Sequence, residues 1–218
     1  MSNNDSFIDE VTEEVRRDRL FALMRKYGWV GILAILAIVG GTAWNEWSKR
    51  SAEERARSYG DALAAAIGLT DPAARAAALD AVAADAAQAG LLRLIVSADA
   101  LARNDKARAL DALEALAETQ EAPQLYRDLA QLKRVMIAGP DMDAAERDAL
   151  LQTLATPGAP FRPLAMEQQA LALVDAGKTD EALAALGRIL EESTLTPGLR
   201  RRAAQLIVAL GGDPAPPG

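Results

Sequence analysis

The 218-residue sequence contains no cysteine and no histidine. The lack of cysteine excludes disulfides and thiol nucleophiles, and the lack of both residue types excludes zinc sites with the usual ligands. Catalytic devices in which histidine acts as acid or base are excluded as well. These absences remove many classes of enzyme.

Aromatic residues are also scarce, at 4% of the chain, and positive charge is not in excess. The 24 basic and 31 acidic residues give a net charge of −7, so no domain-wide positive field exists to attract nucleic acid. Alanine, by contrast, supplies 48 residues. Alanine-rich stretches favour helices with closely spaced axes, so an all-α fold is predicted rather than a sandwich or barrel.

One segment near the N-terminus is long and apolar. No formal charge occurs from Tyr27 to Asn45, and these 19 residues approach the roughly 20 needed to cross a hydrocarbon core. Aromatic rings flank the segment, as is typical at headgroup depth: Tyr27, Trp29, Trp44 and Trp47. We predict a transmembrane helix over residues 27–47. A buried core helix is the alternative, but it does not account for aromatics at both ends.

The segment could also be a cleaved signal peptide. The charged segment of 26 residues before it is longer than an ordinary n-region, so an uncleaved anchor is favoured. Five basic residues precede the segment and four follow it closely, a slight bias that favours a cytoplasmic leader over residues 1–26. The large C-terminal domain is then expected outside the cytoplasm.

Two later segments match each other at a spacing of 73 residues, about twice a repeat of 36. They run from Asn104 to Leu116 and from Gly177 to Ile189, and both place a turn residue first and alanine five positions later, at Ala109 and Ala182. A looser copy between them has Gly139 at the turn and Ala149 at the alanine position, with a longer loop. This spacing is typical of helix–turn–helix solenoids.

A helix of about 14 residues is predicted before each turn, at Leu91–Arg103, Leu125–Ala138 and Leu164–Ala176. Here the sequence resembles the tetratricopeptide repeat, with small residues at Ser97 and Ala170, a glycine or asparagine at the turn, alanine in the second helix and a late proline at Pro197. It departs from the consensus at Leu132 and lacks the aromatic residues of the first helix. We predict a transmembrane helix that continues into a tetratricopeptide-repeat-like α-solenoid over residues 48–210, in which Asp71 and Pro72 start a helix, and a disordered tail over 211–218.

On the tetratricopeptide frame, a set of first-helix residues faces the concave side of the solenoid. The candidate partner-binding residues are Tyr126, Leu129, Lys133, Met136, Glu167, Leu171 and Asp175. Two interpretations stay open: flanking helices cover this apolar surface, or it is an exposed groove for a peptide. In an open groove, the most accessible side chains should be the polar or amphipathic ones, Tyr126, Lys133, Glu167 and Asp175.

No pattern predicts a catalytic, cofactor or metal site. Paired carboxylates such as Asp180–Glu181 and Glu191–Glu192 have no nucleophile or phosphate loop near them and are expected to be solvated. Asp141 and Asp143 begin like a calcium loop, but Ala145 replaces the next ligand. The run from Arg200 to Arg202 is interpreted as solvated surface, with at most one ion pair to an acid of the preceding helix.

The leader and anchor together, EEVRRDRLFALMRKYGWVGI, resemble the YfgM family of bacterial inner-membrane proteins, and the resemblance extends over nearly the whole chain. It implies an ancillary subunit of the Sec translocon whose domain faces the periplasm. The implied partners are translocon subunits, a membrane-anchored periplasmic chaperone of the prolyl-isomerase type and emerging, unfolded client chains. The resemblance implies no catalytic residues and no cofactor.

Two functional hypotheses follow. In the first, the chain is a non-enzymatic, membrane-tethered interaction module at the translocon. In the second, it is a structural scaffold for cell-envelope or division machinery, in which anchor and leader bind and the solenoid is a spacer.

Overall fold

The computed structural model describes the backbone of residues 3–193 and 195–214; within these ranges, the side chains of residues 3–24, 26–28, 31, 32, 34, 35, 86 and 87 are not described. The chain divides into two compact units, Met1–Gly60 and Asp61–Gly218. Every regular element in the described ranges is a helix, which confirms the all-α prediction.

Helix α1 runs without interruption from Asn3 to Ile67, so the prediction that the helix continues past Trp47 is confirmed. The stretch after Trp47 contains no proline, and two exposed pairs at helical spacing support it, Glu46–Arg50 at 2.9 Å and Glu53–Arg57 at 3.5 Å. The last turns of α1 belong to the second unit, where Leu63 and Ala66 are buried.

Among the residues that could be searched, no helix combines the length and hydropathy that a membrane crossing needs. Within the predicted anchor, the side chains at positions 27, 28, 31, 32, 34 and 35 lie outside the described residues. Positions 215–218 of the predicted disordered tail lie outside them as well.

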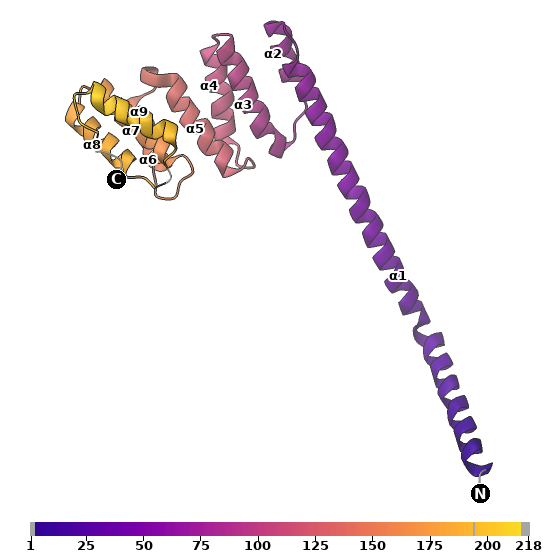
Figure 1. Cartoon of the computed structure of the whole chain (residues 1–218). Coiled ribbons are helices and arrows are strands. Elements are labelled where there is room, and N and C mark those ends of the chain that lie inside the picture. Colours follow the sequence, from indigo (N-terminus) through magenta and orange to yellow (C-terminus); the bar gives the residue numbers. More distant parts are fainter. Residues whose placement is uncertain (1–2, 194, 215–218) are drawn as a thin grey trace. The chain divides into compact units, whose positions relative to one another are not determined.

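The second unit is a row of helices that follow one another in chain order (Figure 1). We call α3 (Ala86–Ala102), α5 (Gln124–Ala138), α7 (Arg162–Asp175) and α9 (Pro197–Ala209) the first helices, and α4 (Lys106–Glu118), α6 (Ala144–Leu154) and α8 (Thr179–Leu190) the second helices. A first helix and the second helix that follows it form a pair: α3–α4 and α7–α8 are the outer pairs, and α5–α6 is the middle pair. The remaining elements of this unit are α2 (Pro72–Ala81), which precedes the pairs, and the 3₁₀ turn η1 (Gly139–Asp141), which follows α5. From α2 to α8, each helix packs against its successor, and the first helices also contact one another, α3 with α5, α5 with α7 and α7 with α9. This arrangement confirms the predicted solenoid.

Short polar side chains begin several of these helices. Asp71 accepts a hydrogen bond from the Ala74 amide at 2.7 Å, with Pro72 in the first turn, as predicted. Asp85, Asp105, Asp143 and Thr196 cap α3, α4, α6 and α9 in the same way. The caps fix where each helix starts and therefore which residues face its neighbours.

Three first helices end alike. Asn104, Gly177 and Gly211 follow α3, α7 and α9 with φ of 61°, 72° and 81°. In each case the backbone N–H of the following residue donates a hydrogen bond of 2.9 Å to the carbonyl oxygen five residues earlier. The donors and acceptors are Asp105 and Ala100, Lys178 and Leu173, and Gly212 and Ile207. Helix α9 is therefore a fourth first helix, which the sequence analysis did not identify.

The second helices share a register but differ at one position. The eighth residue after each N-cap is a buried leucine, at Leu113, Leu151 and Leu186. The fourth residue is a buried alanine in α4 and α8, Ala109 and Ala182, as predicted, but Arg147 in α6. The prediction that Ala149 occupies this position was wrong, because Ala149 is exposed. The loop after Gly139 is longer than the corresponding loops, and the predicted position lay two residues too far along the chain.

The middle pair also differs in its first helix. Ser97 and Ala170, small residues of the outer pairs, are buried seven residues before the turn, where α5 has Leu132. Leu132 packs in a cluster with Val135, Leu151 and Leu154. Two other clusters, around Leu116 and around Leu186, form the cores on either side.

Candidate interaction surface

A groove lies on the first helices of the C-terminal half. It is an open pocket of about 640 Å³, and three helices line it: Met136 from α5, Glu167, Gln168 and Leu171 from α7, and Arg202, Gln205, Leu206 and Ala209 from α9. We call this pocket the first-helix groove. Its volume falls within the range of about 300–1,000 Å³ typical of ligand sites.

The structure brings three of the predicted partner-binding residues together in this groove, Met136, Glu167 and Leu171. Met136 keeps 54% of its surface exposed although it is large and apolar. Leu91, on the first helix α3, is also exposed. These exposures favour the interpretation of an open surface over one covered by flanking helices.

Glu167 is not the accessible side chain that the sequence predicted. It is buried, at 9% exposure, and holds the Arg202 guanidinium through two bonds, from Nε to Oε1 at 2.8 Å and from Nη2 to Oε2 at 2.9 Å. The hydrogen bond to Glu167 raises the pKa of Arg202. The pair joins α9 to α7, so the arginine run does contribute an ion pair, but to the previous first helix and not to α8.

The other predicted residues lie outside the pocket. Tyr126 is half-buried against the cluster around Leu116, and its ring atom Cδ2 would lie 3.1 Å from a Cβ atom at Gly90. Leu129 and Lys133 are half-buried on α5, and Asp175 is exposed at the end of α7. Tyr126 and Lys133 are thus less accessible than predicted, whereas Asp175 is as accessible as expected.

Four groove residues come from α9 and were missed by the sequence analysis. The signals for this helix were present: Thr196 caps it, Pro197 opens it and Gly211 ends it as Gly177 ends α7. The run from Arg200 to Arg202 was interpreted only as solvated surface, and the helix that contains it was not predicted to continue the series of first helices.

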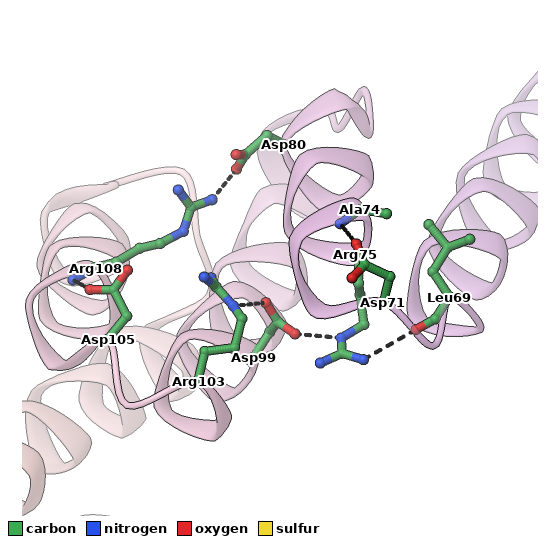
Figure 2. Close-up of polar contacts among 9 residues, drawn as sticks. All are labelled: Leu69, Asp71, Ala74, Arg75, Asp80, Asp99, Arg103, Asp105 and Arg108. Carbon is green, nitrogen blue, oxygen red and sulfur yellow. Dashed lines mark hydrogen bonds and ion pairs between the residues drawn. The ribbon is translucent and has the colours of Figure 1, made fainter.

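A second polar centre, also missed, joins the N-terminal helices of the solenoid (Figure 2). Asp99 of α3 is nearly buried and accepts hydrogen bonds from Arg75 Nε of α2 at 2.5 Å and from Arg103 Nε at 3.0 Å. Arg75 Nη1 also donates to the Leu69 carbonyl after α1, at 3.1 Å. Nearby, Arg108 of α4 forms an ion pair with Asp80 of α2.

The charges of this centre are fixed. Burial by itself raises the pKa of Asp99, but the hydrogen bonds and positive charges of Arg75 and Arg103 outweigh it, so the pKa lies below its ordinary value. Arginine does not lose its proton in proteins. The centre therefore positions α2 against α3 and has no group suited to proton transfer near neutral pH.

Within the part of the chain that the structure describes, no three acidic, histidine or cysteine side chains gather where they could hold a metal ion. The described polar side chains of the two centres are mostly arginines paired with carboxylates. These charge-assisted pairs join neighbouring helices.

Comparison with known proteins agrees with the observed helix pairs. No curated protein and no solved structure matches the chain. A family model described as a tetratricopeptide repeat-like domain matches residues 25–202. Such domains generally mediate protein–protein interaction and are typically non-catalytic. Because the match extends over most of the sequence, the chain belongs to the tetratricopeptide repeat-like domain family.

Proposed function

We propose that this protein is a non-enzymatic, membrane-tethered interaction module that binds an apolar polypeptide segment in the first-helix groove. The observation that carries the proposal is the open pocket between α5, α7 and α9, which the exposed Met136 lines. A large exposed apolar side chain in a concave site is a typical anchor point for a partner.

The groove offers two kinds of contact. Met136, Leu171, Leu206 and Ala209 provide apolar surface, while the amides of Gln168 and Gln205 can bond to the backbone of a bound segment. The pair of Arg202 and Glu167 holds two walls of the groove together.

Charged side chains extend the groove along its helices. Lys133 lies three residues before Met136 on α5, and Asp175 lies four residues after Leu171 on α7, so each falls one turn away on the same face. Charges of opposite sign at these places would orient a bound segment.

The tether is the segment 27–47 of α1, with the leader 1–26 in the cytoplasm and the solenoid in the periplasm. Seven of its described large apolar side chains support this proposal, because they are more than half exposed and need an apolar cover: Trp29, Leu33, Leu36, Ile38, Val39, Trp44 and Trp47. Trp44 and Trp47 also pair, with ring centroids 5.4 Å apart.

The proposed setting is the bacterial inner membrane, where the protein would act as an ancillary subunit of the Sec translocon. It would link the translocon to a membrane-anchored periplasmic chaperone or to emerging secreted chains. The support for this setting is the resemblance of the leader and anchor to the YfgM family.

The binding test is the double variant Lys133→Glu with Asp175→Lys in the full-length chain. Capture of translocon, chaperone or client proteins from mild detergent should fall to about a tenth, since close charge pairs contribute on the order of 1–2 kcal/mol. The matched control is Arg201→Glu with Asp111→Lys, which makes the same charge changes at exposed residues outside the groove. Wild-type recovery by the groove variant would exclude the groove as the binding surface.

The setting is tested separately. Crosslinking from the anchor should capture translocon subunits; capture of only division or outer-membrane assembly proteins would support the scaffold hypothesis instead. Protease added to intact spheroplasts should remove the solenoid and leave a short membrane-bound fragment. Full protection of the solenoid would contradict the orientation.

A further inference from the structure

A second groove lies between α6 and α8, on a different face of α7 from the first-helix groove. It consists of two adjoining pockets of about 310 and 250 Å³ that share Gln169, Ala185 and Arg188. We call it the second-helix groove. Its residues have no role in the function proposed above.

The groove forms where a long side chain on α6 lies next to small side chains on α7 and α8. Small residues line its floor: Ala172 of α7, Ala176 directly after α7, and Ala185 of α8. Its α6 wall contains Arg147, at the position where the other second helices bury an alanine against the preceding first helix. A long side chain keeps α6 from closing onto its neighbours, and the alanines leave the space beside it unfilled.

The rim of the groove is basic in a chain whose net charge is −7. Arg147, Lys178 and Arg188 line one pocket, and Asp148 is the one carboxylate among its lining residues. Arg188 is exposed, and no described carboxylate lies within ion-pair distance of it.

The other two cations are only weakly neutralised. Lys178 and Glu181 are both more than half exposed and lie 3.4 Å apart, and an exposed pair of this kind is easily exchanged for another partner. The Arg147 side chain is half-buried, and its described carboxylate partner is its exposed sequence neighbour Asp148, at 3.2 Å. Arg162, at the far end, is already held by Glu192 at 2.8 Å and contributes less.

We propose that the second-helix groove is a docking surface for an acidic segment of a partner protein, in which carboxylates alternate with small apolar residues. Carboxylates of the segment bind Arg188, Arg147 and Lys178, and its small side chains lie on the alanine floor. The Gln169 amide, shared by both pockets, bonds to the backbone of the segment. The two grooves would let the solenoid hold two polypeptides at once.

The test uses the full-length chain in mild detergent and a labelled peptide of alternating glutamate and alanine, followed by fluorescence anisotropy. The peptide should bind, and binding should weaken as salt is raised. Arg188→Glu should weaken binding about tenfold and Arg188→Gln by less, because the glutamine removes the charge without reversing it. Helix content should not change, since Arg188 is exposed.

The matched control is Arg201→Glu, an equal charge change on an exposed residue of α9. It should weaken binding less than about twofold, as should Lys133→Glu with Asp175→Lys in the first-helix groove. The proposal is overturned if the peptide does not bind, if Arg188→Glu and Arg201→Glu weaken it equally, or if a lysine–alanine peptide binds as well. Binding of anionic vesicles alone, or Arg188-dependent self-association without peptide binding, would also overturn it.

Discussion

The outer helix pairs, α3–α4 and α7–α8, differ from the middle pair, α5–α6, in how closely their helices can approach. The outer pairs bury small residues on both helices, Ser97 with Ala109 in one pair and Ala170 with Ala182 in the other. The middle pair has Leu132 and Arg147 at the same places. Accordingly, α6 buries only Leu151 and Leu154, whereas α8 buries four residues.

This difference shows that two kinds of helix packing, one with small residues and one with large residues, can stabilise the same fold. Small residues let two helix axes come close, and larger residues fill the space when the axes stand apart. The middle pair is therefore not a degraded copy of the outer ones. Its larger side chains fill its own core and leave the second-helix groove beside Arg147.

The most severe test of this comparison is Leu132→Ala, which places a small residue where the outer pairs have one. If the middle pair were merely a divergent copy, the change would be tolerated. We expect instead a loss of about 2–5 kcal/mol of unfolding free energy, because Leu132 is 2% exposed and its removal leaves a cavity. Chemical denaturation of the full-length chain, followed by circular dichroism, measures the loss. A loss below about 1 kcal/mol would contradict the interpretation that the middle pair depends on large side chains for its packing.

The converse change is Ala182→Leu in the outer pair α7–α8. Ala182 is fully buried, so the larger side chain should overpack the helix crossing and lower the unfolding free energy by about 1–3 kcal/mol. Ala149→Leu on α6 is the control, because Ala149 is exposed and should tolerate leucine. Equal melting temperatures for Ala182→Leu and the wild type would show that the crossing is wider than the burial indicates.

A smaller effect separates the two outer pairs from each other. Five residues before the turn, α3 has Asp99, bonded to Arg75 and Arg103, where α7 has Ala172. Asp99→Asn should cost about 1 kcal/mol at pH 7, because hydrogen bonds to a charged acceptor are replaced by weaker ones.

This cost should depend on pH. The folded-state pKa of Asp99 lies below its ordinary value, so its contribution to stability is present above about pH 4 and is lost as the pH falls through the folded pKa. Denaturation curves of wild type and Asp99→Asn should therefore converge in acid. A constant difference from pH 7 to about pH 3 would mean that the carboxylate charge is not what the arginines recognise.

Much of the fold could be predicted from the sequence because its signals are local. The cap at Asp71, the turns at Asn104 and Gly177 and the buried alanines Ala109 and Ala182 depend on residues close in the chain. The register of α6 could not be found in this way. The longer loop after Gly139 displaced the pattern, and Arg147 replaced the alanine that would have marked it.

The candidate site was less predictable, because its contacts join residues far apart in sequence. The resemblance to the tetratricopeptide repeat predicted Met136, Glu167 and Leu171 on one surface, and the three residues do line one pocket. The burial of Glu167 depends on Arg202, which lies 35 residues later in the chain. No pattern among the sequence neighbours of Glu167 predicts that pair. The Asp99 centre likewise depends on Arg75, 24 residues earlier.

The looser packing of α6 has a consequence for the way the solenoid moves. In a solenoid, stability is the sum of each unit and its neighbour interfaces, so the unit with the least buried surface opens first. Amide hydrogens of α6 should accordingly exchange with solvent sooner than those of α4 and α8. Such an opening would transiently separate the α3–α4 core from the α7–α8 core while each stays folded, and the middle of the domain would then act as its hinge.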